Sequence, residues 1–266
     1  MRRRLTPHVL AGLASAAVLV PIYLIALSAL SARGEVSAWP KALLPRALSL
    51  ETLTFFFGVR GVWLALGQSL VVAALTVVFA ILLGAPAGYA LARFRFAGKD
   101  AVRLVVLLTR AFPIAILTLP LAVRFIRLGL YDTPLGVALV HTALALPFAI
   151  LVTASLFLGI PVELEEAAWT LGCTRPAAFR RIVLPLALPG LTAAAIFAFV
   201  ISWNEVFAAS ILTLRHRTLT AYLLAGLNES PLYFRFAGGF FLIVPSLIFI
   251  FSVRRYLFSM WGIARR

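Results

Sequence analysis

Residues 159–189 read GIPVELEEAAWTLGCTRPAAFRRIVLPLALP, a charged segment with its own helical pattern set between two long apolar runs. Pro161 suits the first turn of a helix, and the three glutamates that follow lie near the positive end of that helix. Gly172 stands where a residue in the left-handed conformation ends a helix. The stretch therefore predicts a helix, a glycine corner and a second short helix capped at Thr174, outside the membrane.

The first of these helices has a narrow apolar stripe. Leu164, Ala167, Ala168 and Leu171 follow at helical spacing, and the small alanines allow close approach to another surface. A loop helix of this kind can also lie on lipid headgroups, but three acids in its first turn disfavour an anionic leaflet. The pattern indicates a rigid knob that contacts something in the aqueous phase.

The rest of the chain is apolar enough to require a bilayer. Its 266 residues are 63% hydrophobic, and the mean hydropathy is +1.05. At roughly 20 residues per span, this length suits about six membrane-spanning helices. We therefore expect an all-α integral membrane protein whose six spans cover the runs 9–30, 62–92, 102–123, 135–158, 184–214 and 237–258.

The formal net charge of +15 would suggest nucleic acid as a partner of a soluble protein. Here the basic residues gather at the ends of the apolar runs, and more of them fall in the segments that would be cytoplasmic if the N-terminus is inside. We expect both termini, and the loop at 159–185, to be cytoplasmic. The lipid bilayer is the expected surface partner, and no nucleic acid is expected.

Several classes of site have no support in the sequence. Cys173 is the only cysteine, and the three histidines lack ligand spacing, so neither a disulfide nor a metal site is expected. The phosphate-binding pattern GxxxxGK[ST] does not occur, and no nucleophile–base pair stands out. We expect a chain that is not an enzyme and holds no cofactor.

A few polar residues fall within the predicted spans. Glu205 is the only acid there, and two explanations remain open for it: a functional buried charge, or a position near the outer end of the fifth span that reaches water. Asn204 and Gln68 are, with Glu205, candidates for a substrate path, although polar residues also hold spans together.

The spacing in the charged stretch resembles a known family. Glu166-Ala167-Ala168, Gly172, Ile182, Leu184 and Pro185 match the loop of binding-protein-dependent ABC importer permeases. Three further segments are similar to the carbohydrate type of this family, and within it to the six-span second permease subunit of maltose-type transporters: YALARF at 89–94, WNE at 203–205 and RYL at 255–257.

The resemblance implies a function and a set of partners. The chain would be the permease subunit of an ATP-driven importer of a sugar or oligosaccharide in a bacterial or archaeal cytoplasmic membrane. It would pair with a second permease subunit, an ATPase dimer that binds ATP and Mg, and an extracytoplasmic substrate-binding protein. Residues 163–171 would be the coupling helix between spans four and five, seated in the ATPase. The implied coupling residues are Glu163, Glu165, Glu166, Ala167, Ala168, Leu171 and Gly172.

The resemblance also implies one transmembrane permease domain over residues 1–266. It comprises a first span with an external loop (1–61), a five-span core (62–258) containing the coupling loop (159–185), and a cytoplasmic tail (259–266). Two features depart from the family: Leu171 stands where an aspartate is common, and the tail lacks the usual small-residue segment. The alternative from another class is a self-sufficient secondary transporter, for whose proton coupling only Glu205 is placed suitably.

Overall fold

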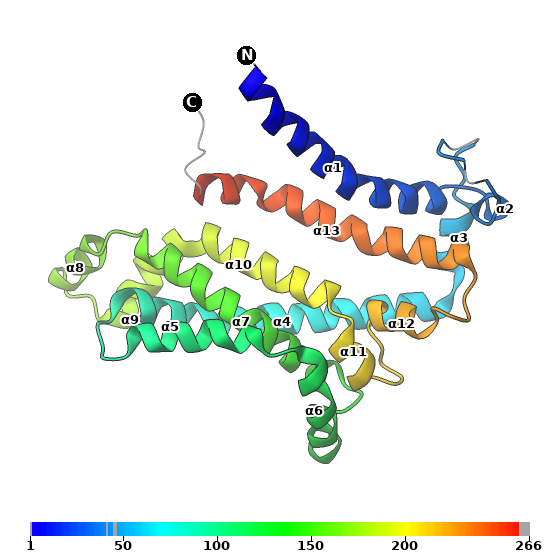
Figure 1. The fold of residues 1–266 in the computed structure, drawn as a ribbon. Helices are drawn as coiled ribbons and strands as arrows, with labels where there is room; N and C mark the ends of the chain where they lie inside the picture. Colours follow the sequence, from blue (N-terminus) through cyan, green and yellow to red (C-terminus); the bar gives the residue numbers. More distant parts are fainter. Residues whose placement is uncertain (1, 41, 45–46, 261–266) are drawn as a thin grey trace. The chain divides into compact units, whose positions relative to one another are not determined.

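The computed structural model describes residues 2–40, 42–44 and 47–260, and every regular element in that part of the chain is helical (Figure 1). This confirms the all-helical fold class. The chain divides into two compact units, residues 1–64 with 222–247 and residues 65–221 with 248–266. The expected tail, 259–266, lies outside the described residues except for its first two positions.

Aromatic side chains hold the first unit together. Phe56 is fully buried, and its ring centroid lies 5.1 Å from that of Phe234 and 6.1 Å from that of Phe241. The Trp63 ring packs on Phe57 at 5.4 Å. The elements of this unit are α1 (Arg2–Ala29), α2 (Arg33–Val36), α3 (Glu51–Gly58), the start of α4 (Arg60–Arg93), the end of α12 (Leu219–Ala225) and the first part of α13 (Leu232–Met260).

The second unit contains most of the predicted core and the charged loop. In it the long helices α4, α7 and α10 are accompanied by shorter ones (Figure 1). Its further elements are α5 (Lys99–Leu108), α6 (Ile114–Leu128), α7 (Pro134–Leu158), α8 (Glu163–Thr170), α9 (Arg175–Ala178), α10 (Leu184–Asn204) and α11 (Phe207–Leu212).

Small residues let α4 and α7 approach each other closely. Gly84 and Gly88 lie one turn apart on α4, and a Cβ atom on Gly88 would lie 2.1 Å from the Oγ1 atom of Thr153. That hydroxyl also donates a hydrogen bond to the carbonyl oxygen of Gly84, at 3.0 Å. Close backbone approach at small residues is how helices associate in lipid, where burial of apolar surface supplies no driving force.

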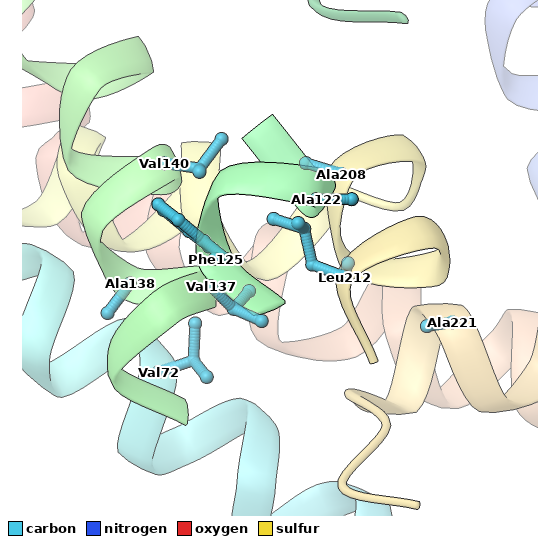
Figure 2. Packing of buried hydrophobic residues seen from close by; sticks show 10 residues of the cluster. Val72, Ala122, Phe125, Val137, Ala138, Val140, Ala208, Leu212 and Ala221 are labelled. Atoms are coloured by element: carbon cyan, nitrogen blue, oxygen red, sulfur yellow. The ribbon is translucent and has the colours of Figure 1, made fainter. Parts of the chain in front are cut away.

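A second cluster joins α6, α7 and α11. Figure 2 shows Phe125 of α6, Val137 of α7 and Leu212 of α11 gathered in one buried group. The nearby alanines, Ala122 and Ala208, keep the helices close. This packing fixes α11 against the bundle, which matters for the polar cluster described below.

Four helices are long and apolar enough to cross a membrane, or five if a bent pair forms one span, within the described residues. The four contain 8–29, 60–93, 134–158 and 175–204. The sixth expected run, 237–258, lies in α13, which is helical from Leu232 to Met260. Only its part up to Ile248 is among the described apolar helices, so this run is neither confirmed nor contradicted as a span. The number of spans that the structure supports is therefore four to five.

The third expected run, 102–123, is not a straight helix. The segments before and after Pro113 are bent by 88°. Phe112 has φ −76° and ψ 121°, the extended conformation that a following proline imposes, and Pro113 caps the next helix. By contrast, Pro86, Pro147 and Pro245 lie inside continuous helices.

Candidate functional site

The loop between α7 and α10 folds as a helix, a corner and a second helix. Gly172 has φ +86°, the left-handed conformation expected for it. The N–H of Cys173 donates to the carbonyl of Ala168 at 2.9 Å, and the N–H of Gly172 to that of Trp169 at 3.0 Å. These two bonds are the Schellman pattern, which satisfies carbonyls left open at the end of α8.

The second helix begins where the sequence predicted. Thr174 is the N-cap residue, with extended backbone angles, but its side chain makes no capping hydrogen bond. Helix α9 continues through a π-helical turn, Phe179–Val183, into α10. Across the corner, the Arg175 guanidinium lies 5.4 Å from the centre of the Trp169 ring. The corner is therefore joined to α10 without an intervening loop.

One face of α8 is buried against its own chain. The Glu165 side chain is 1% exposed, and its Oε1 lies 2.6 Å from Nε of Arg93 at the end of α4. The hydroxyl of Tyr89 donates to Oε2, and Nη2 of Arg93 donates to the carbonyl of Ile160 at 2.8 Å. Ala168, 4% exposed, shares this face. The ion pair fastens α8 to the end of the second expected span.

The opposite face of α8 is exposed and defines the candidate site. We call Glu163, Leu164, Glu166, Ala167 and Leu171 the exposed face of α8. Leu171 is 85% exposed, unusually open for a leucine beside a rigid corner. The carboxylates of Glu163 and Glu166 form no ion pair with any residue that the structure describes. This face combines two unpaired negative charges with a small apolar patch, as a surface that docks into a groove would.

The sequence-predicted coupling residues therefore fall on two sides. Glu163, Glu166, Ala167 and Leu171 come together on the exposed face, and Gly172 makes the corner. Glu165 and Ala168 instead face inward. Sequence reasoning missed Arg93 as the partner of Glu165, although a tyrosine and an arginine one turn apart at the end of an apolar run are a usable signal.

The three path candidates have different surroundings. Glu205 ends α10 rather than lying inside a fifth helix over 184–214, and its carboxylate accepts from the N–H groups of Ala208 and Ala209 at 2.8 and 3.0 Å. Asn204 is exposed and donates to the Val200 carbonyl of its own helix. The buried Oε1 atom of Gln68 has no hydrogen-bond partner within the described residues.

His141 completes a buried polar cluster that the sequence did not reveal. Its Nε2 lies 3.0 Å from Oε2 of Glu205, and its Nδ1 lies 2.9 Å from Oγ of Ser202. The imidazole is fully buried in α7. Glu205 thus joins α7 to the break between α10 and α11, a structural function that neither of its two expected explanations included.

A carboxylate also joins the α6–α7 loop to the α11–α12 loop. Oδ1 of Asp132 accepts from the N–H groups of residues 214, 215 and 216 at 2.8, 2.9 and 3.0 Å. Partial burial raises the pKa of this carboxyl, but the three backbone donors outweigh burial and hold the pKa below its ordinary value. The described residues contain no group of side chains suited to a metal ion.

Comparison with known proteins agrees with this architecture. Residues 80–260 match the family model described as "Binding-protein-dependent transport system inner membrane component". The chain is 36% identical over 197 residues to the trehalose transport system permease protein SugB of Mycobacterium tuberculosis, covering 72% of each protein. It is 34% identical over 224 residues to the arabinooligosaccharides transport system permease protein AraQ of Halalkalibacterium halodurans, covering 81% of this chain and 78% of AraQ.

A solved structure shares the fold. The crystal structure of a bacterial ABC transporter involved in the import of the acidic polysaccharide alginate aligns with a TM-score of 0.74 at 20% identity, covering 96% of this chain and 95% of that one. The fold and the loop define an integral membrane transport component. The chain belongs to the family of binding-protein-dependent transport system inner membrane components. It is a permease subunit of an ABC importer, a transport subunit rather than an enzyme, and the secondary-transporter alternative is set aside.

Proposed function

We propose that this permease subunit imports a sugar or oligosaccharide and that α8 is its coupling helix, seated in a separate ATPase subunit. The observation that carries the proposal is the arrangement of α8. Its exposed face offers unpaired carboxylates beside Ala167 and Leu171, while the ion pair between Glu165 and Arg93 holds its other face to α4. Because its buried face is attached to α4 and its exposed face is free to bind a partner, α8 can transmit a movement of that partner to the rest of the chain.

Docking into a partner would raise the free-energy contribution of the side chains on the exposed face. A solvent-exposed ion pair contributes about 0–1 kcal/mol. Once Glu166 is desolvated in a groove against a basic residue of the ATPase, its loss would weaken the contact by about 2–5 kcal/mol. Closure of the ATPase dimer on ATP would then move α8, and the continuous helix from α9 into α10 would carry that movement into the membrane.

The description of the family supports one of the proposed partners, a binding protein. We propose a heterodimer with a second permease subunit, two ATPase subunits that bind ATP and Mg, and an extracytoplasmic substrate-binding protein, in a bacterial or archaeal cytoplasmic membrane. The sugar assignment rests on the names of relatives, which transport trehalose and arabinooligosaccharides. Asn204, Glu205 and Gln68 remain the proposed path residues, with Glu205 acting from its bond to His141.

Six spans with both termini cytoplasmic, in one permease domain, remain our proposal for the topology. Support comes from the six apolar runs and the basic bias of the expected cytoplasmic segments. The test begins from a variant in which Cys173 is replaced by serine. A single cysteine is then placed at Ser37 or at Ser259, and an impermeant thiol reagent applied to intact cells should label the first but not the second. Labelling at Ser259 and not at Ser37 would invert the topology.

The function is tested by reconstitution. The chain co-expressed with its neighbouring permease and ATPase subunits should co-purify with the ATPase, and ATP hydrolysis in liposomes should rise with binding protein and the cognate sugar. The single chain in liposomes should take up no labelled sugar with ATP present. Uptake by the single chain would contradict the proposal.

A further inference from the structure

A cavity of about 450 Å³ lies between the end of α4 and the corner after α8. Its walls are mainly apolar, with two arginines among them, and the lining includes Tyr89, Arg93, Phe94, Trp169, Arg175 and Phe179. The cavity is on the buried side of α8, so it is separate from the exposed face that we propose for the ATPase.

The charges around the cavity do not cancel. Glu165, its one acid, is already engaged by Arg93 and by the hydroxyl of Tyr89. The guanidinium of Arg175 forms no ion pair with any residue in the described part of the chain, and it lies over the face of the Trp169 ring. Among the described residues, the cavity therefore has one guanidinium without an ion-pair partner, that of the solvent-exposed Arg175.

A second donor, on the lining residue Trp169, is also unsatisfied. Nε1 of Trp169 is buried and has no hydrogen-bond partner among the described residues. A buried donor without a partner costs stability, and such groups are rare in native proteins. An indole N–H next to an uncompensated arginine is suited to an anionic acceptor that reaches both.

The position of the cavity indicates the source of that anion. Arg93 is the last residue of an apolar helix long enough to cross a membrane. In the topology that we propose this end of α4 is cytoplasmic, and on that basis we place the cavity at the headgroup depth of the cytoplasmic leaflet. Tyrosine, tryptophan and arginine are favoured at that depth, where an apolar body and a polar tip are both satisfied. A small soluble anion has no apolar part that could contact the apolar walls. A lipid would place its glycerol and upper acyl segments against them.

We propose that this cavity binds one anionic phospholipid of the cytoplasmic leaflet. The phosphate accepts from Nε1 of Trp169 and from the Arg175 guanidinium, and the apolar part lies against the rings of Phe94 and Phe179. Basic pockets between spans at the cytoplasmic side are known to take such headgroups. The proposal goes beyond the transport function and does not depend on which sugar is carried.

Native mass spectrometry of the delipidated full chain in detergent tests the proposal, with phosphatidylglycerol and phosphatidylcholine as probes. We expect one phosphatidylglycerol to be retained in preference to phosphatidylcholine. Arg175→Gln should weaken its binding about fivefold, from the loss of one basic contact. Trp169→Phe keeps the ring and removes only the N–H, and should weaken binding about three- to tenfold.

Arg180→Gln is the matched control, because Arg180 is exposed nearby and does not line the cavity. It should change binding by less than about twofold. Equal retention of both lipids, or equal losses in Arg180→Gln and Arg175→Gln, would overturn the proposal. Displacement of phosphatidylglycerol by millimolar inorganic phosphate would also overturn it, because the site would then take a soluble anion. Circular dichroism identifies any variant that has lost its helices.

Discussion

Replacing Glu165 by alanine removes the acid that pairs with Arg93 behind α8. The arginine side chain is 11% exposed, so its charge cannot recover full hydration when its partner is lost. Breaking a buried ion pair from one side costs about 3–5 kcal/mol. Against a total stability of roughly 5–15 kcal/mol for a domain, this loss is large. We expect α8 to separate from the end of α4 in this variant.

Two comparisons isolate the pair. Glu166→Ala removes the same side chain one position along, on the exposed face, and should change stability by no more than about 0.5 kcal/mol. The double variant Arg93→Met/Glu165→Leu removes both charges and leaves none uncompensated, so it should be less destabilised than Glu165→Ala. Detergent-denaturant unfolding of the purified chain, followed by circular dichroism, gives the three values.

Function should separate from assembly in the same variants. Glu165→Ala leaves the exposed face of α8 intact, so the ATPase should still co-purify while sugar uptake falls by more than about tenfold. Glu166→Ala should instead weaken co-purification, because its carboxylate lies on the docking side. If Glu165→Ala and Glu166→Ala are equally stable, the ion pair does not form and the reasoning is refuted.

Three other changes have defined outcomes. Gly172→Val should lower the free energy of unfolding by about 1–2 kcal/mol because of the left-handed backbone alone, since a side chain at this position meets no neighbour. Gly172→Asn should lower it less, and equal unfolding midpoints for the two variants would contradict a left-handed residue 172. Asp132 has a lowered pKa, so its contribution to stability is present above its unfolded pKa and is lost as the pH falls through the folded value. The free energy of unfolding should therefore fall more below about pH 4 in the wild type than in Asp132→Asn. Parallel pH profiles would show that the backbone hydrogen bonds to the Asp132 carboxylate do not stabilise the fold. His141→Ala should lower the free energy of unfolding by about 1–3 kcal/mol, because Glu205 and Ser202 lose their hydrogen-bond partner. If this variant is as stable as the wild type, the three side chains do not form a stabilising cluster.

Local features of the site were predictable from the sequence because their causes are local. The left-handed conformation at Gly172 follows from a helix that must end before Thr174, and the apolar runs follow from the solvent that they require. Three of the long apolar helices follow the expected runs closely, whereas the fourth ends at Asn204 instead of continuing to residue 214. Neither this end of α10 nor the degree of bending at Pro113 was predicted. A proline fixes one backbone angle, and its neighbours decide the rest.

The features that sequence reasoning missed depend on partners distant in the chain. Glu165 and Glu166 are adjacent and chemically identical, and Arg93, 72 residues away, decides which of them is buried. His141 and Glu205 are separated by 64 residues, and neither belongs to a local pattern. In so short a helix, the sequence does not determine whether Ala167 or Ala168 faces the protein. Packing buries Ala168.

The central claim is that the exposed face of α8 docks into the ATPase, and bulk on that face tests it most directly. Ala167→Trp fills the proposed contact without touching the buried face, and Ala38→Trp makes the same substitution at an exposed position of the expected external loop. In the reconstituted transporter, ATPase co-purification and binding-protein-stimulated hydrolysis should both be lost in Ala167→Trp and retained in Ala38→Trp. Wild-type assembly and stimulated hydrolysis in Ala167→Trp would show that α8 is not the coupling element.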